Sequence, residues 1–596
     1  MKSFIYTIIV MVLIFGLSNA GIINVPGDQS TLQAGINAAQ NGDTVLVADN
    51  TYFENINFKG KAITVASHFL IDGDSTHIDS TIINGSQPSH PDTGSVVLFV
   101  SGEDTTSILC GFTLTGGSGT FWDLIPQYQS RDGGGILCEN SGCKILNNKI
   151  VNNSTSEIYS SGGGILAYAD SPIPSGAYYV IIEGNEITDN SVTAGTGNGN
   201  GGGIAIYCDE NINGKIIDNI ISNNECFSDA NLALGGGLDC YSDNTINPPQ
   251  IIIKNNNISH NSAISNANVP GTPEAQGGGM RIRGYYAMVQ GNNITYNTLN
   301  SLSGSAGGGI RIVASNNSSI IDGNIIKHNS SIGAAGGMGI HTSNPFMINN
   351  IVAENSGETG GGIVFYQSNP QEFSNNTIFN NQATSVGGGI RIWYSSLVSL
   401  NNIIWGNHAP VDSQIHIHTG GNLQAVYCDI QGGWPGEGNI DEDPCLVADS
   451  LSNNSPCIGA GTTPCPPYDN NRRMRPYPAG SNPDIGAWES KLDSPIVGIV
   501  WQPTAGIIQS YGLEQNYPNP FNPSTTIEFA LPHSGFVTLK IYNILGEEMA
   551  ALVSERLTAG KYKYEWDASD LASGVYLYRL EAGKDFIKTK KLVLLK

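Results

Sequence analysis

Arginine, aspartate and tyrosine recur at two fixed distances after runs of glycine in the middle of this 596-residue sequence. In "GGGLDCYS" the residues Asp239 and Tyr241 follow the glycines, "GGGMRIRG" contributes Arg281 and Arg283, and "GGGIRI" contributes Arg311. Guanidinium groups bind carboxylates through two parallel hydrogen bonds, and aromatic rings offer flat apolar faces on which a sugar ring can stack. These residue types therefore predict binding of an anionic carbohydrate, provided that the fold brings them to one surface.

The segments that contain these residues are copies of one repeat. A glycine triplet or a one-residue variant of it begins at Gly133, Gly162, Gly201, Gly235, Gly277, Gly307, Gly337, Gly360 and Gly387. Each is followed by the motif Asn-x-Ile/Val-x-x-Asn, whose first residue is Asn148, Asn185, Asn219, Asn256, Asn292, Asn324, Asn350, Asn376 or Asn402. The last three steps between these asparagines are equal and indicate a unit of about 26 residues, which is typical of a solenoid.

Short runs of alternating apolar residues, such as "YVIIEGNEIT", are strand signals bounded by Gly and Asn turns. A leucine-rich solenoid is the alternative at this period, but its Leu-x-x-Leu-x-Leu pattern is missing, and a propeller blade is longer. We therefore predict an all-β right-handed parallel β-helix over residues 21–425, with a closing segment over 426–490. Stacked asparagines are expected to form an amide ladder, and the glycines to supply positive φ and close backbone approach at a corner.

Alternation along the strand after each glycine triplet places the candidate site residues on the outside of the solenoid in two columns. The first column is expected to contain Asp239, Arg281, Arg311, His341 and Arg391, and the second Tyr207, Tyr241, Arg283 and Trp393. We expect them to share one solvent-facing surface, bordered by loops 191–200, 226–234 and 262–276. The candidates for binding a polysaccharide are Tyr207, Asp239, Tyr241, Arg281, Arg283, Arg311, His341, Arg391 and Trp393. The alternative is that Asp239 and Arg281 form a cross-strand surface pair and that the tyrosines are ordinary strand residues.

Whether the protein is an enzyme stays open at this point. Polygalacturonase-like β-helix enzymes carry paired aspartates and a Gly-His-Gly motif, and neither occurs here in recognisable form. The alternative to a non-catalytic binder or adhesin is a pectate-lyase-like, Ca²⁺-dependent polysaccharide lyase, in which Arg281, Arg283 or Arg311 would be the base. No acidic calcium motif of recognised spacing lies beside these arginines. Ca²⁺ is therefore a candidate cofactor for which the sequence indicates no ligands.

The beginning of the sequence predicts export. Lys2, an apolar run from Phe4 to Leu17 and small residues up to Ala20 are typical of a signal peptide, 1–20, cleaved after Ala20. The run is too short to favour a transmembrane anchor. Export permits disulfides, and Cys138 with Cys143 is one candidate pair. The net charge of −24 argues against nucleic acid as a partner. We expect a monomer.

The two ends of the repeat region resemble those of known β-helix proteins. "STLQAGINAAQNGDTVLVADNTYFENI" is similar to the capping helix and first strand of right-handed β-helices, with the helix expected to be capped at Ser30. "SPCIGAGTTPCPPYDNNRRMRPYPAGSNPDIGAWES" (455–490) resembles the closing segment of bacterial surface β-helix proteins.

The composition changes after a linker at 491–510. Residues 511–596 contain ten basic and ten acidic side chains, and alternating strands are expected over 525–529, 537–542, 562–566 and 575–580, as in a small Ig-like β-sandwich. "NPFNP", "YNILG", "SGVY" and the terminal "KLVLLK" resemble the sorting domain read by the type IX secretion system. The resemblance implies that the secretion machinery is a partner and that the protein is secreted or held on the outer surface of a Gram-negative-type bacterium.

Overall fold

The structure is a computed structural model. It describes residues 20–596 except 124–128, 170–177, 209–211, 245–247, 268–274, 302–304, 316–317, 448, 496–499, 503–509, 558, 570 and 583–585. The predicted signal peptide lies outside the described residues, apart from Ala20. The chain divides into two units, described separately below: Met1–Asp441 with Tyr468–Arg472, and Glu442–Pro467 with Arg473–Lys596.

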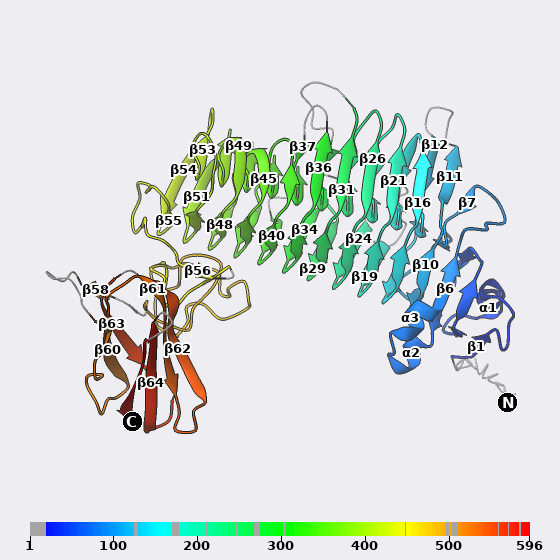
Figure 1. Ribbon diagram of the computed structural model, residues 1–596. Helices are drawn as coiled ribbons and strands as arrows, with labels where there is room; N and C mark the ends of the chain where they lie inside the picture. The colour runs from blue at the N-terminus through cyan, green and yellow to red at the C-terminus, as the bar shows by residue number, and fades with distance from the viewer. Residues whose placement is uncertain are drawn as a thin grey trace, which may run out of the picture. The chain divides into compact units, whose positions relative to one another are not determined.

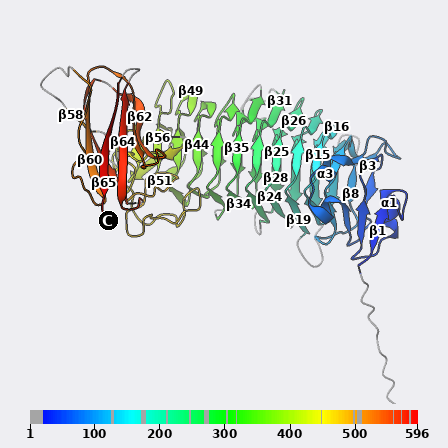
Figure 2. The same cartoon turned by 60° about the horizontal axis from the view of Figure 1, so that its bottom comes forward.

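The first unit is a stack of coils, each contributing one strand to each of three long sheets (Figures 1 and 2). One sheet runs from β1 (Ile22–Val25) to β54 (Asn422–Val426), and a second from β3 (Asn50–Tyr52) to β55 (Asp429–Ile430). The pairing of neighbouring coils within these sheets is parallel and in register. The predicted parallel β-helix is therefore confirmed.

The third sheet carries the residues singled out by the sequence. Its strands, in spatial order, are β4 (Ile56–Asn57), β8 (Val97–Phe99), β13 (Ile136–Glu139), β18 (Ile165–Ala169), β23 (Ile204–Cys208), β28 (Leu238–Ser242), β33 (Met280–Arg283), β38 (Ile310–Val313), β42 (Met338–His341), β46 (Ile363–Tyr366), β50 (Ile390–Trp393) and β53 (Ile415–Ile417). Alternate residues such as Met280 and Ile282 point inward and are fully buried with their counterparts from the other two sheets. Burial of each such side chain contributes about 1.5–3 kcal/mol.

The predicted asparagine ladder exists, and a second ladder runs beside it. Asn256 donates from Nδ2 to Asn292 Oδ1 on the next coil at 2.9 Å, and Asn292 donates to Asn324 in the same way. The last asparagine of each motif forms the second ladder, as in the bond from Asn261 Nδ2 to Asn297 Oδ1 at 3.0 Å. Each buried amide is thus satisfied by the coil above, which avoids a penalty of order 1–3 kcal/mol per orphaned group.

The glycine triplets turn the corner before the third sheet, as predicted. Gly277 has φ +68°, and a Cβ on Gly278 would lie 2.5 Å from the Gly308 carbonyl oxygen of the next coil. The predicted start of the seventh triplet at Gly337 is wrong. Ala335, with φ +58°, takes its first place, because Ile310 pairs with Met338.

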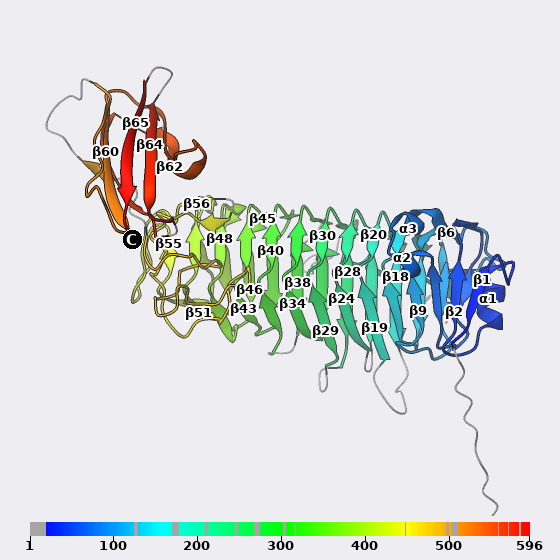
Figure 3. The same ribbon diagram turned by 90° about the horizontal axis from the view of Figure 1, so that it is seen from below.

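Helices occur only near the start of the described chain (Figure 3). Helix α1 (Leu32–Ala38) buries Leu32 against the first coils. Its N-cap is Thr31, whose Oγ1 accepts from the Ala34 N–H at 3.1 Å, so the predicted cap at Ser30 is off by one residue. Two short helices that the sequence did not predict, α2 (Phe69–Asp72) and α3 (Thr76–Ser80), form an insertion between β5 (Thr64–Ser67) and β6 (Thr81–Asn84).

The second unit contains two antiparallel four-stranded sheets over a shared apolar core. The strands expected from the sequence fall within β60 (Ser524–Leu531), β61 (Gly535–Tyr542), β63 (Gly560–Asp567) and β64 (Gly574–Ala582). They are joined by β58 (Val500–Gln502), β59 (Gly512–Leu513), β62 (Glu548–Leu557) and β65 (Phe586–Leu594).

Candidate functional site

Two columns of side chains run along the outer face of the third sheet, because register places each residue over its counterpart on the next coil. The first column contains Leu137, Leu166, Ala205, Asp239, Arg281, Arg311, Gly339, Val364, Arg391 and His416. The second contains Glu139, Tyr168, Tyr207, Tyr241, Arg283, Val313, His341, Tyr366 and Trp393. The expected outward direction is confirmed, but His341 belongs to the second column rather than the first.

The segments expected to be loops beside this face contain strands where the structure describes them, and residues 268–274 of the third segment lie outside the described residues. A wall of parallel strands runs next to the first column: β12 (Gln129–Asp132), β17 (Tyr159–Ser161), β22 (Gly199–Asn200), β27 (Ala233–Leu234), β32 (Ala275–Gln276) and β37 (Ser305–Ala306). A groove of about 510 Å³ lies between this wall and the columns of β13 to β33. Its aromatic lining is Trp122, Tyr159, Tyr168, Tyr207 and Tyr241, and its charged lining is Asp132, Glu139, Arg281 and Arg283.

The expectation that all candidate residues face solvent is wrong for Asp239, Arg281 and Arg311 in the first column, whereas Arg391 in the same column is half-buried. Asp239 is 0%, Arg281 3% and Arg311 7% exposed. The second column remains accessible, since Tyr207 and Tyr241 are half-buried and Arg283 is exposed. The physical reason is the strand wall, which covers the column nearest the glycine corner and leaves the more distant column open.

Asp239 and Arg281 form an ion pair at the floor of the groove. Arg281 donates from Nε to Asp239 Oδ1 at 2.6 Å and from Nη2 to Oδ2 at 3.0 Å, while the Tyr207 hydroxyl donates to Oδ2 at 2.9 Å. The cross-strand pair considered as the alternative therefore exists, but it is buried rather than on the surface. The Arg281 and Arg283 guanidinium carbons lie 5.6 and 5.2 Å from the centre of the Tyr241 ring.

Arg311 lies on the next coil and has a different environment. Its Nε is buried without a hydrogen-bond partner, and it makes no ion pair among the described residues. Burial, followed by the positive charge of Arg281, lowers the pKa of Arg311 to about 10, so it stays charged at neutral pH. The guanidinium extends over Gly339, where a Cβ would come within 2.9 Å of Arg311 Nη1.

Aromatic rings continue the second column beyond the arginines. The ring centres of His341 and Tyr366 are 4.8 Å apart and nearly parallel, and Trp393 follows 4.8 Å from Tyr366. The Arg391 guanidinium carbon lies 4.9 Å from the Trp393 ring centre, and His418, which the sequence reasoning missed, lies 4.9 Å beyond. No glycine triplet precedes His418, so the repeat alone gave no signal for it.

Titratable groups in and beside the groove are shifted by burial. Desolvation raises the pKa of Asp132 to about 7, and the nearby Glu139 adds to the rise. Desolvation, followed by the charges of Arg311 and Arg283, lowers the pKa of His341 to about 4. Asp132 is therefore about half protonated near neutral pH, whereas His341 is neutral there. Sequence reasoning missed Asp132 because it lies on a wall strand, outside the two columns.

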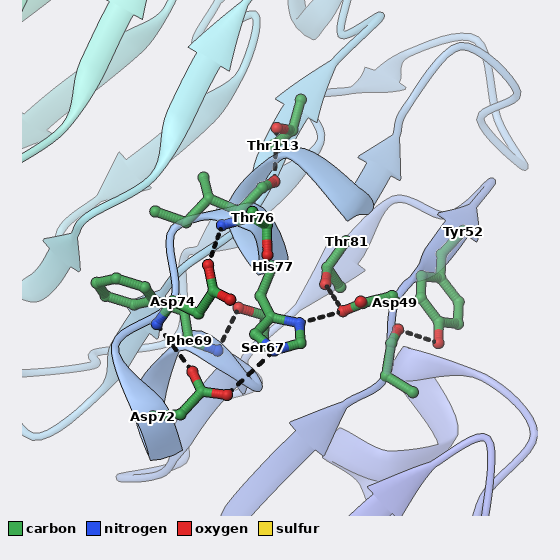
Figure 4. A network of polar contacts seen from close by, with 12 residues as sticks. Asp49, Tyr52, Ser67, Phe69, Asp72, Asp74, Thr76, His77, Thr81 and Thr113 are labelled. Carbon is green, nitrogen blue, oxygen red and sulfur yellow. Dashed lines mark hydrogen bonds and ion pairs between the residues drawn. The ribbon is translucent and has the colours of Figure 1, made fainter.

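A separate polar cluster joins the α2–α3 insertion to the solenoid (Figure 4). His77 contacts Asp49 Oδ1 through Nδ1 at 2.7 Å and Asp72 Oδ2 through Nε2 at 3.2 Å. The two carboxylates lie on opposite edges of the imidazole and so do not converge on one point. In the described part of the chain, no group of three or more His, Cys, Asp or Glu residues is arranged to hold a metal ion.

The comparisons with known proteins match two parts of the chain. Residues 247–430 match the right handed beta helix region, and residues 515–595 match the secretion system C-terminal sorting domain. No curated protein matches the chain. Among the described helices, none is long and apolar enough to cross a membrane.

Proposed function

Because the chain is a secreted or cell-surface right-handed β-helix protein with a type IX sorting domain, we propose that it binds an extracellular polysaccharide along the outer face of its third sheet. The observation that carries the proposal is the groove of about 510 Å³ with its five aromatic side chains. Aromatic faces bury apolar area and tolerate many orientations of a stacked ring. A concave site with aromatic walls and few polar groups is typical of ligand binding.

The second column extends this surface past the groove. From Tyr168 to Trp393 it crosses seven coil steps, or about 34 Å at the spacing of neighbouring strands. Aromatic rings recur at both ends of this stretch, and Arg283 and Val313 lie between them. A polymer laid parallel to the solenoid axis would contact several coils at once, so that weak binding at each coil sums to useful affinity.

The proposal names an acidic polysaccharide because of the charges on this face. The chain has a net charge of −24, yet the two columns of β28, β33 and β38 hold three arginines and a single carboxylate, Asp239. These three coils carry more positive than negative side chains, although the groove also contains Asp132 and Glu139 from earlier coils. A local excess of positive charge attracts anionic polymers and sets their position. The sorting domain delivers the protein and is not part of the binding surface in this proposal.

Binding is tested with the full secreted chain by affinity gel electrophoresis on polygalacturonate, alginate and neutral polysaccharides. The change Tyr168→Ala should weaken binding about threefold to tenfold, because one stacking contact is lost. Tyr286→Ala, on the outer face of β34 (Tyr286–Gln290) in a different sheet, is the matched control. Equal binding by both variants and the unchanged protein would refute the groove as the binding surface.

The same samples distinguish binding from cleavage. A Ca²⁺-dependent lyase would generate unsaturated uronate ends, which absorb ultraviolet light, from polygalacturonate or alginate. Incubation with and without Ca²⁺ is expected to produce no such absorbance. A rise that depends on Arg283 would instead identify the protein as a lyase and contradict the non-catalytic proposal.

A further inference from the structure

We infer that Arg311 is the floor of a specific subsite for one anionic ring substituent, a carboxylate or a sulfate ester, on the polysaccharide. The inference rests on the proposed function for the identity of the ligand as a polysaccharide. The negative charge of the bound substituent rests on a separate observation. Arg311 is 93% buried, its Nε lacks a partner, and no carboxylate pairs with it among the described residues. Transferring an unpaired charge out of water costs several kcal/mol, so an anion at this position recovers free energy that the free protein lacks.

The contrast with the preceding coil shows that pairing is possible in this column. Arg281 occupies the same position as Arg311 in register and is satisfied by Asp239. The position after Arg311 in the column is Gly339, which supplies no acceptor side chain. The column therefore contains a carboxylate for one arginine and none for the next.

The side chains around the guanidinium are small. Arg311 lies over Gly339, and Ala335 is the next side chain beside that glycine. The wall position next to this coil is Ala306, which pairs with Ala334. In this inference the ligand reaches Arg311 past these small side chains, which admit only a compact group of carboxylate or sulfate size.

Neighbouring groups favour an anion over a cation. Arg283 is exposed on the adjacent coil, within reach of the same polymer. His341 is the second-column residue next to Val313 and remains neutral near pH 7, so it can donate a hydrogen bond without competing for the charge. A guanidinium presents two parallel N–H groups to a carboxylate or sulfate oxygen pair, which selects such groups over neutral hydroxyls.

The experiment compares charged polymers with their neutral counterparts: polygalacturonate with its methyl ester, and a sulfated galactan with its desulfated form. The full secreted chain should prefer the charged member of at least one pair by about tenfold, or about 1.4 kcal/mol. Arg311→Gln should abolish this preference and leave binding of the neutral polymer unchanged. The pair that shows the preference identifies the substituent as carboxylate or sulfate.

Two further variants separate the subsite from general charge. Gly339→Ala keeps every charge but places a Cβ against Arg311 Nη1, and should also abolish the preference. Lys254→Gln, on the outer face of β29 (Gln250–Lys254), removes one positive charge elsewhere and should preserve it. Equal loss in Lys254→Gln, or a preference that survives in Arg311→Gln, would overturn the inference.

A third arm distinguishes failure of the subsite from failure of the proposed function. If the unchanged protein binds neutral and charged polymers equally, polysaccharide binding stands and the subsite is refuted. If it binds no polymer, the proposed function fails, and thermal unfolding with sodium sulfate or galacturonate at constant ionic strength decides the subsite. A rise in Tm that Arg311→Gln abolishes supports the subsite, and an equal rise or none overturns it.

Discussion

The coils of β33 and β38 place the same residue type at the same point and give it opposite environments. Arg281 and Arg311 pair in register and are both buried. Arg281 contacts a carboxylate from the coil before it, whereas Arg311 is followed by a glycine that has no side chain to pair with it. The repeat thus determines where a side chain lies, and the neighbouring coil determines whether that side chain finds a charged partner.

The largest effect is expected from breaking the satisfied pair. Arg281→Gln leaves Asp239 buried with only the Tyr207 hydroxyl as a donor, and should lower the free energy of unfolding by about 3–5 kcal/mol. Urea denaturation followed by circular dichroism measures the loss. The double variant Arg281→Gln/Asp239→Asn should recover part of it. A single variant as stable as the unchanged protein would show that the pair contributes nothing to folding.

A smaller loss is expected in the amide ladder, where pairing is between neutral groups. Asn292→Ala removes the acceptor for both the backbone N–H and the Nδ2 of Asn256, and should cost about 2–3 kcal/mol. Asn293→Ala, the exposed next residue, is the control and should change stability by less than about 0.5 kcal/mol. Similar stability of the two variants would argue against a structural role for the ladder.

A gain in stability, rather than a loss, is expected when the unpaired Arg311 is replaced. Arg311→Met replaces an uncompensated buried charge with an apolar side chain of similar length, and should raise the free energy of unfolding by about 1–2 kcal/mol. The same denaturation experiment in buffer without sulfate or phosphate measures it. A loss of stability comparable to that of Arg281→Gln would mean that Arg311 has a structural partner, and the contrast between the coils would disappear.

The smallest effect on stability is expected from the contact between His77 and Asp49, which depends on whether His77 is protonated. The hydrogen bond that His77 donates to Asp49 raises the pKa of His77, helped by the charges of Asp49 and Asp72. Stabilisation by protonated His77 is therefore present below the unfolded pKa of about 6.5 and is lost as pH rises through the higher folded value. Hydrogen exchange of residues 69–80, corrected for intrinsic rates, should show less protection at alkaline pH. In His77→Gln this pH dependence should vanish, and its persistence would assign it to another group.

The sequence predicted the fold from features that repeat, and it missed features that occur once. Glycine triplets or their variants and the asparagine motif recur in nine successive coils, so their stacking was apparent without a structure. The burial of Asp239 and Arg281 depends on strands such as β22 and β27, which are only two residues long and carry no periodic signal. The position of His341 was misjudged because Ala335 replaces a glycine in the corner, and an alanine in that conformation is not expected from its intrinsic preference.

The last residues of the two amide ladders determine what a second copy of the chain would meet at this end of the stack. A stack whose every coil offers an acceptor to the next would also offer one to a second molecule, and exposed strand edges invite such joining. Here the Asn402 N–H points to the Cys428 thiol at 3.4 Å, and Asn407 donates to the side chain of Gln414 at 2.8 Å. Each ladder therefore finishes on a side chain that is not asparagine. A second copy stacked against this end would find no further asparagine with which to continue the ladder.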